Sequence, residues 1–402
     1  MALLPVDEAL RLLLDGAVAR PAERVALSDA AGRVLAAPLE ALRTQPPFDA
    51  SAMDGYAVRA ADVASVPVRL AVIGTAAAGR GFSGEVGAGQ AVRILTGAPL
   101  PAGADTVVIQ ENARRLDDGG IKVLETVATG RHIRRRGLDF SAGDVLLEAG
   151  RVLDPAALSL AAAANHATLD IVTRPLVAII ATGDELLLPG SEPGPDQIIA
   201  SNAYGVAAIA SAAGARVLDL GIVGDDRAAI AERLADATKA GTDVVVTLGG
   251  ASVGDHDLVH EVLGSQGVTL DFWKIAMRPG KPLMFGRRDD MRFLGMPGNP
   301  VASLVCSQLF LKPLVAALGG RQHEPNLRPA VLGAPMAAND LRQDYVRARI
   351  AMKDGVLTAT PFSVQDSSML RILADSGGLI VRAPFAPAAD QGDSCTVLML
   401  GA

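Results

Sequence analysis

Acidic, hydroxyl and basic side chains recur in this chain inside short turns that are bounded by glycine or proline. Seven short motifs, six of which are tight turns of this kind, read SAMDGYAV (51–58), RILTGAPLPAGAD (93–105), RRRGLD (134–139), ATGDEL (181–186), LGGASVGDHD (248–257), MRPGKPL (277–283) and MPGNPVAS (296–303). Core packing does not require polar residues in loops, whereas rigid elements often hold such loops in place for function. We therefore expect one site that is assembled from several separate stretches of chain.

Four polar loops, three of them from the motifs above, follow predicted strands of one parallel sheet. The turn 182–185 follows PLVAIIA, Asp225 and Asp226 follow RVLDLGIV, the turn 249–257 follows TDVVVTL, and the turn 296–300 follows RFLG. In an open parallel sheet, ligands bind outside the carboxyl ends of the strands. The sequence therefore predicts a binding site at this edge.

The residue types at this edge indicate an anionic ligand with a bridging cation. Glycines in the turn 248–257 allow backbone N–H groups to approach an anion before a helix that is expected to start near Asp257. Arg278 and Lys281 flank a Pro-Gly pair and can neutralise phosphate. Carboxylates in the same domain are Asp184, Glu185, Asp225 and Asp257. Carboxylates beside a phosphate-binding edge fit a divalent cation, for which Mg²⁺ is the ordinary choice.

Several enzyme classes lack their sequence signatures here. The chain contains neither a Walker A motif nor a Rossmann fingerprint, which argues against an NTPase and a dehydrogenase. It has no G-x-S-x-G elbow, and its histidines form no triad spacing with a serine, which argues against an ordinary hydrolase. Taken alone, the pairs Asp54-Gly55 and Thr96-Gly97 are more typical of plain turns than of a site.

Composition indicates a folded protein with several domains and no nucleic-acid partner. The chain has 402 residues, of which 50% are apolar and 20% are charged, and this length predicts two to four domains. The net charge of −7 and the 3% of aromatic residues give neither a basic field nor stacking platforms. The basic run RHIRRR (131–136) fits a solvated loop and a small anion site equally well.

The two cysteines and the N-terminal residues argue against a zinc site, a disulfide framework and a signal peptide. Cys306 and Cys395 lie far apart without metal-ligand spacing, which disfavours a zinc site and a disulfide framework, and Cys306 is expected in the core. Asp7 and Glu8 make the N-terminus an amphipathic helix rather than a signal peptide. We find no uninterrupted apolar span of membrane length, and we expect a cytoplasmic protein without a membrane partner.

Hydrophobic periodicity predicts a multidomain α/β plus β fold. Residues 1–45 and 141–172 are expected to form a discontinuous helical domain, in which a helix over 5–20 packs on a helix that starts after Asp154. Residues 46–140 are an inserted small β domain with a hairpin at 117–120. Residues 173–323 are a doubly wound parallel α/β domain, and residues 324–402 return to β structure.

In this order the seven motifs resemble those of the MoeA and gephyrin E-domain family of molybdopterin molybdenumtransferases, from about Leu3 to the C-terminus. The resemblance implies that the α/β domain binds molybdopterin, that the C-terminal domain is β-barrel-like, and that the protein is a homodimer. It implies insertion of molybdenum from molybdate into adenylylated molybdopterin, assisted by Mg²⁺. AMP is released and molybdenum cofactor is formed, and a molybdopterin adenylyltransferase is the pathway neighbour.

The resemblance also implies roles for individual residues. Catalytic roles fall on Asp54, Thr96, Asp139, Glu185, Asp225 and Asp257, of which Glu185, Asp225 and Asp257 are the expected metal ligands. Lys274, Arg278 and Lys281 would hold phosphate or molybdate, and Pro297 and Pro300 would shape the dithiolene pocket. The other expected binding residues are Arg134, Thr182, Gly183, Asp184, Gly249, Gly250, Ser252, Gly254, Gly298, Asn299 and Ser367.

The chain departs from the family pattern at two places. Many members carry Lys where Arg278 stands. The positive charge is kept, but the compact ammonium group is replaced by a planar guanidinium that can form two parallel hydrogen bonds. The family's Gly-Ser-His near the C-terminus is here Asp366-Ser367-Ser368.

Two alternative functions remain open. Gephyrin relatives use this fold as a scaffold for receptor peptide loops, and we see no apolar recognition groove in the sequence of 329–402. The adenylyltransferase that acts one step earlier resembles residues 175–320 alone, and the inserted β domain with Asp54 and Thr96 favours the later, molybdate-handling step.

Overall fold

A computed structural model describes residues 3–249 and 258–400 of the chain. The chain divides into two compact units. The first unit consists of Met1–Glu23, Gly32–Ala36 and Ile171–Ala402, and the second of Arg24–Ala31 and Ala37–Asp170. The small β domain therefore belongs to one unit, and the α/β and C-terminal domains belong to the other.

A six-stranded mixed sheet forms the centre of the first unit. Its order is β16 (Arg216–Val223), β13 (Leu176–Thr182), β17 (Val244–Leu248), β21 (Met291–Met296), β20 (Pro282–Arg288) and β18 (Thr269–Lys274). The first four strands are mutually parallel, as predicted, whereas β20 and β18 run antiparallel to their neighbours. The prediction of a wholly parallel sheet is wrong for β20, which runs opposite to the other five strands. Only Asp289 and Asp290 join β20 to β21, and a parallel connection needs a crossover of a dozen or more residues.

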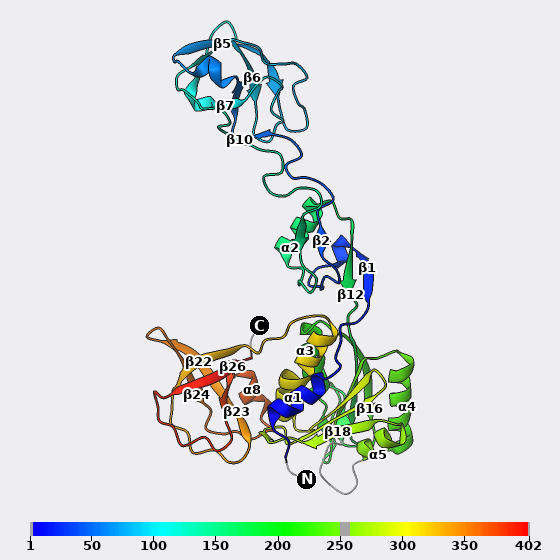
Figure 1. Cartoon of the computed structure of the whole chain (residues 1–402). Coiled ribbons are helices and arrows are strands. Elements are labelled where there is room, and N and C mark those ends of the chain that lie inside the picture. Colours follow the sequence, from blue (N-terminus) through cyan, green and yellow to red (C-terminus); the bar gives the residue numbers. More distant parts are fainter. Residues whose placement is uncertain (1–2, 250–257, 401–402) are drawn as a thin grey trace. The chain divides into compact units, whose positions relative to one another are not determined.

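Helices cover both faces of this sheet, which confirms the doubly wound arrangement (Figure 1). On one face lie α1 (Val6–Leu14), α3 (Asn202–Ala212) and the segment Pro300–Leu318. On the other face lie α4 (Arg227–Lys239) and α5 (Leu258–Ser265). Neighbouring residues of a strand point to opposite faces, so Val177 and Ile179 of β13 join one core while Ala178 and Ile180 join the other.

The N-terminal helix does not have the partner that the sequence predicted. In α1, Val6, Ala9 and Leu13 are buried in the core of the first unit. The helix α2 (Pro155–Ala163) belongs to the second unit, where it contacts η1 (Leu27–Asp29). Spacing of three and four marks a helix face that must be buried, but it does not name the surface that buries it.

The start of α2 confirms its predicted capping residue. The Asp154 carboxylate accepts a hydrogen bond from the backbone N–H of Ala157 at 2.8 Å, and Pro155 occupies the first turn.

The segment Pro300–Leu318 is long and apolar enough to cross a membrane, although 72% of it is buried inside the fold. The expectation that no span reaches this length overlooked it because Lys312 interrupts the apolar run. The segment comprises α6 (Pro300–Cys306), a π turn η4 (Ser307–Leu311) and α7 (Lys312–Leu318). The N–H of Lys312 bonds to the carbonyl of Ser307, so the π turn admits Pro313, which has no N–H to donate.

Strands after residue 326 close into a five-stranded barrel. The order is β23 (Gln343–Lys353), β24 (Val356–Pro361), β22 (Leu327–Leu332), β26 (Ser394–Met399) and β25 (Gly378–Arg382), and pairing of β23 with β25 closes the ring. The helix α8 (Leu370–Ala374) lies between β24 and β25 in the sequence. From the α/β domain, β19 (Met277–Arg278) pairs with β23, so the two domains share backbone hydrogen bonds.

The second unit contains the predicted β domain. Its sheet has the order β7 (Thr106–Ile109), β4 (Gly55–Val58), β6 (Gln90–Ile94), β5 (Val68–Ala76), β9 (Ile121–Val123) and β8 (Ala113–Arg115). The predicted hairpin at 117–120 joins β8 to β9. Its short helices are η2 (Ala60–Val63) and η3 (Gln110–Asn112).

Four two-stranded pairs complete the secondary structure of the described residues. They are β1 (Ala22–Ala26) with β12 (Thr168–Val172), β2 (Leu39–Glu40) with β11 (Val145–Leu147), β3 (Ala50–Ser51) with β10 (Ile133–Arg134), and β14 (Leu186–Leu187) with β15 (Ile198–Ile199).

Candidate functional site

The carboxyl ends of four adjacent parallel strands surround a cavity of about 900 Å³ in the first unit. Thr182 ends β13, Asp225 follows β16, Gly249 follows β17, and Pro297 follows β21. The structure thus brings together residues that lie more than a hundred positions apart in the sequence. The predicted site residues that line the cavity are Thr182, Gly183, Glu185, Asp225, Gly249, Pro297, Gly298, Asn299 and Pro300.

Two glycines of this edge occupy positions that no larger residue fits. Gly249 has φ +97°, and a β-carbon there would lie 2.6 Å from the carbonyl oxygen of Thr182. Gly183 has φ +149°, and its β-carbon would lie 2.4 Å from the Glu185 carboxylate. The turn after β17 can pack this closely against β13 only because Gly249 lacks a side chain, whereas Gly183 has a φ that residues with a side chain rarely adopt.

Carboxylates give the edge a strongly negative character. Asp184 accepts a hydrogen bond from the backbone N–H of Asp225 at 3.0 Å. The pKa of Asp225 is raised, first by the loss of solvent around its carboxylate and then by repulsion from Asp184 and Glu185. A cation at this edge would relieve the repulsion between the carboxylates.

The described residues contain no group of three or more His, Cys, Asp or Glu side chains arranged to hold a metal ion. Glu185 and Asp225 nevertheless suit Mg²⁺, because proteins usually bind this ion through one or two carboxylates plus substrate phosphates. The predicted ligand Asp257 and the predicted binding residues Gly250, Ser252 and Gly254 lie outside the described residues.

A loop of the C-terminal domain forms one wall of the cavity. The side-chain amide of Asn299 donates a hydrogen bond to Oγ of Ser367 at 2.9 Å, and the N–H of Val301 donates to the Ser367 carbonyl at 3.1 Å. Ser368 and Leu370 line the cavity. Ser368 also donates to the Asp366 carboxylate from its N–H and its hydroxyl, which lowers the pKa of Asp366. Ser367 therefore anchors the loop, while Ser368 faces the cavity.

Sequence reasoning missed the apolar wall of the cavity. Leu186, Ile198 and Ile199 belong to the small strand pair β14–β15 and line the cavity, and Ile198 is 56% exposed. The signal in the sequence that could have revealed this wall is the isoleucine pair Ile198-Ile199, which follows the Pro/Gly-rich stretch 189–195.

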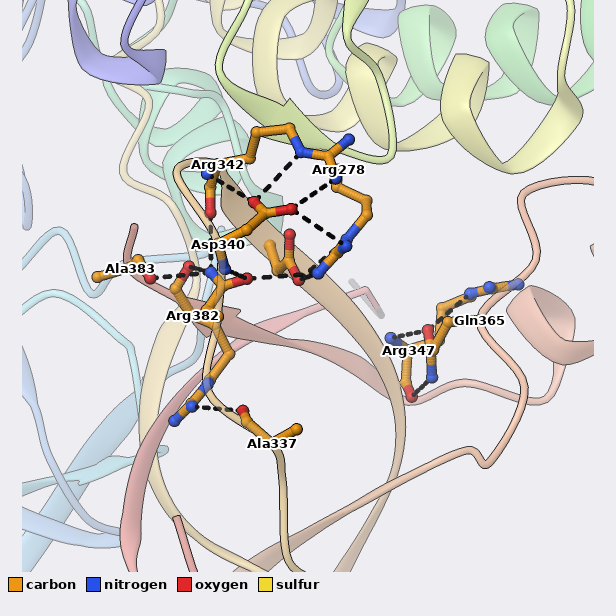
Figure 2. A network of polar contacts seen from close by, with 10 residues as sticks. Arg278, Ala337, Asp340, Arg342, Arg347, Gln365, Arg382 and Ala383 are labelled. Atoms are coloured by element: carbon orange, nitrogen blue, oxygen red, sulfur yellow. Dashed lines mark hydrogen bonds and ion pairs between the residues drawn. The ribbon is translucent and has the colours of Figure 1, made fainter. Parts of the chain in front are cut away.

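The three expected cations of the first unit differ in their surroundings, and none of them lines the cavity. Arg278 faces the carboxylate of Asp340 from the C-terminal domain (Figure 2). It also forms an ion pair with Asp344 of the same domain. Nζ of Lys274 lies 5.9 Å from the ring centroid of Trp273. Lys281 is exposed and, within the described part of the chain, has no ion-pair partner. Its neighbour Pro282 lines the cavity.

In the second unit, the structure brings the predicted pair Asp54 and Thr96 into direct contact. Oδ1 of Asp54 accepts hydrogen bonds from the backbone N–H of Thr96 at 2.7 Å and from its hydroxyl at 2.8 Å. These two bonds, followed by the charge of Arg93, lower the pKa of Asp54. Asp54 is therefore held as an ionised acceptor.

Arg134 and Asp139 are both exposed in the basic loop of the second unit. The neighbouring Arg135 forms an ion pair with Asp49 at 2.6 Å, and the N–H of Arg136 donates to the same carboxylate at 2.8 Å. Part of the basic run thus maintains the loop structure. The roles of Arg134 and Asp139 stay predictions.

Comparison with known proteins identifies the family. Profiles of the MoeA N-terminal region (domains I and II), of a probable molybdopterin binding domain and of the MoeA C-terminal region (domain IV) match residues 4–165, 178–317 and 329–400. The molybdopterin molybdenumtransferase of Bacillus subtilis is 36% identical over 405 residues, which cover 99% of this chain and 94% of that protein. The chain belongs to the MoeA family of molybdopterin molybdenumtransferases. It is a transferase of molybdenum cofactor biosynthesis.

Other relatives agree with this MoeA assignment. A molybdopterin molybdenumtransferase of a Nostoc species is 37% identical, covering 83% of this chain and 78% of its own length. A solved molybdopterin biosynthesis MoeA protein from Pyrococcus horikoshii covers 99% of this chain and 100% of its own, with a TM-score of 0.83 and 29% identity. The multidomain fold predicted for the MoeA family is thereby confirmed.

The first unit of this MoeA protein contains a second cavity, of about 470 Å³, which the sequence did not predict. It lies among α1, the linker after α7 and strands of the barrel, where Leu10, His323, Tyr345 and Leu398 contribute to its wall. Residues 329–402 contribute only a minority of its lining, so the expectation that their own sequence shows no apolar recognition groove stays a prediction.

Proposed function

We propose that the chain inserts molybdenum from molybdate into adenylylated molybdopterin, releases AMP and forms molybdenum cofactor at the carboxyl edge of the central sheet. The observation that carries this proposal is the cavity of about 900 Å³ at four strand ends, which is lined by glycine turns, by Pro297 and Pro300, and by the carboxylates of Glu185 and Asp225. Its size is within the range of pockets that bind cofactor-sized molecules.

The chemistry of each residue type determines its proposed role in binding and reaction. The turns at Gly183 and Gly249 let the backbone approach the phosphates closely, and Pro297 and Pro300 shape the wall where the dithiolene would lie. Lys281, next to the cavity wall, supplies positive charge for an anionic substrate. Asp54, kept ionised by Thr96, serves the same reaction as an acceptor.

Glu185 and Asp225 would hold Mg²⁺, because their mutual repulsion favours a cation between them. When bound, the ion offsets negative charge that develops as the phosphoanhydride bond to AMP breaks. The protein contributes the carboxylates and a fixed orientation for the phosphates. We further propose that the protein is a homodimer and acts in the cytoplasm.

The test supplies two substrate pairs to the purified protein in the presence of Mg²⁺. We expect AMP release and molybdenum cofactor from adenylylated molybdopterin with molybdate, and no adenylylation of molybdopterin with ATP. Formation of adenylylated molybdopterin from the second pair would instead assign the earlier step.

Two observations favour the later step over the alternatives. The adenylyltransferase step needs only the region that corresponds to residues 175–320, whereas the relatives with the molybdenumtransferase name match the inserted β domain and the barrel as well. A purely scaffolding role gives no reason for like-charged carboxylates at a cavity edge, which cost stability unless they bind something.

A further inference from the structure

The turn 277–281 carries two cations, and the structure treats them differently. Arg278 donates from Nε to Oδ2 of Asp344 at 3.0 Å and from Nη2 to the same carboxylate, and Nη1 lies 3.6 Å from Asp340. Asp340 also pairs with Arg342 at 2.7 Å, so Arg278 and Arg342 lie on either side of it (Figure 2). Two positive and two negative charges make this cluster neutral. It offers no net positive charge to a dianion such as molybdate.

Asp344 is the buried member of this cluster. Its side chain is 8% exposed, and its Oδ1 has no hydrogen-bond partner among the described residues, so Arg278 provides its main compensation. The backbone reinforces the contact, because β19 and β23 pair with Arg278 opposite Asp344. The N–H of Gln343 also donates to the carbonyl of Ala276 at 2.8 Å.

The other side of the turn packs against the α/β core. Gly280 has φ +114°, and a β-carbon there would lie 2.6 Å from the buried Sγ of Cys306. The carbonyl of Lys281 accepts a hydrogen bond from the N–H of Ile275 at 3.0 Å. The turn is therefore fixed between the barrel and α6, and it leads directly into Pro282 of the cavity wall.

We propose that Asp344 is a positioning residue for the molybdenum-transfer reaction, which acts through Arg278. The Arg278–Asp344 pair ties the turn 277–281 to the C-terminal domain, and Lys281 is the cation of this turn that meets the anionic substrate. Arg278 thus fixes the turn and does not bind the substrate itself. This inference rests on the function proposed above.

The experiment compares Arg278→Met, Asp344→Asn and the double variant in steady-state kinetics with molybdate as the varied substrate. If the pair positions the turn, each single variant raises the KM for molybdate about tenfold with a smaller change in kcat, and the double variant is no worse than either. Arg278→Lys keeps the charge and restores part of the loss. If Arg278 binds the anion directly, Asp344→Asn lowers the KM or leaves it unchanged, and that result would overturn the proposal.

A matched control is available in the same domain. Asp271 forms a two-bond ion pair with Arg287 at 3.0 and 2.9 Å, and neither residue lines the cavity. Asp271→Asn therefore removes a similar ion pair, and the KM for molybdate should stay at the wild-type value.

Hydrogen exchange of the turn gives a second readout that does not depend on turnover. Amides of 275–282 should exchange faster in Asp344→Asn than in wild type and Asp271→Asn, because the link to the barrel is lost. Unchanged exchange there would contradict the positioning role. Absence of turnover in the wild-type protein would refute the proposed function instead, so the two failures are distinguishable.

Discussion

Asp54 in the second unit and Asp225 in the first are both aspartates in glycine-bounded turns, yet their surroundings shift their pKa values in opposite directions. Thr96 donates two hydrogen bonds to Asp54 and favours its ionised form. Asp225 faces Asp184 and Glu185, which disfavour its ionised form. The same residue type is thus a satisfied anion in one turn and an anion without a counter-charge in the other.

This contrast indicates which of the two carboxylates is better suited to bind a ligand. Asp54 is stable as an anion without further partners, so it suits the role of an acceptor that stays charged. Asp225 gains most from a bound cation or proton. An acid whose pKa is raised beside a cavity is a better candidate for metal binding than one whose hydrogen bonds already stabilise its charge.

The largest expected effect comes from Asp225→Ala, compared with Asp226→Ala at the adjacent position. Removing Asp225 takes away a proposed ligand, so we expect AMP release to fall at least about 100-fold. Asp226 caps α4 by accepting the N–H of Ala229 at 2.8 Å, so its loss costs about 1 kcal/mol of stability and spares activity. AMP release and denaturant unfolding measure the two outcomes.

A folded Asp225→Ala protein with wild-type activity would remove Asp225 from the mechanism. An inactive but stable Asp226→Ala protein would show that the N-terminal turn of α4, rather than the Asp225 carboxylate alone, is needed.

An intermediate effect is expected for Mg²⁺ as a stabilising ligand. The ion should raise the melting temperature of the wild-type protein, corresponding to about 2.7 kcal/mol when its concentration is 100 times the Kd. Asp225→Ala should lose this shift, whereas Asp54→Ala should keep it. Loss of the shift in Asp54→Ala alone would reverse the contrast drawn between the two aspartates.

The smallest effect concerns Thr96→Val and the titration of Asp54. The folded pKa of Asp54 is lowered, so its stabilising contribution is present above the unfolded pKa and disappears as pH falls through the folded pKa. Without the hydroxyl the folded pKa rises, and this contribution disappears at a higher pH. Carbon NMR of the carboxyl group measures the midpoint, and Thr44→Val, which removes a hydroxyl elsewhere in the unit, should leave it unchanged. An unshifted midpoint in Thr96→Val would mean that the backbone N–H alone sets the pKa.

The sequence predicts the edge of the sheet well because local rules decide it. Apolar strands followed by glycine turns place Gly183, Asp225, Gly249 and Pro297 at one edge in any parallel arrangement. The contact of Asp54 with Thr96 required the structure, because only pairing of β4 with β6 brings their turns together. Their separate turns are common in proteins of any function.

The remaining features depend on tertiary partners that no local pattern encodes. The direction of β20 depends on a two-residue connection, and the partner of α1 depends on which surface its apolar stripe meets. Arg278 has the chemistry of an anion ligand until Asp344, 66 residues later, is placed beside it. Ser368 replaces Ser367 at the cavity because Asn299 binds the Ser367 hydroxyl.

The buried segment Pro300–Leu318 has a consequence for the order in which the chain is synthesised. The strands that cover it, β13, β17 and β21, all precede it in the sequence. A ribosome therefore synthesises these strands before this apolar segment emerges from the exit tunnel. Moving these residues ahead of β13 by circular permutation would expose them to translocation machinery and to self-association while the sheet is still missing.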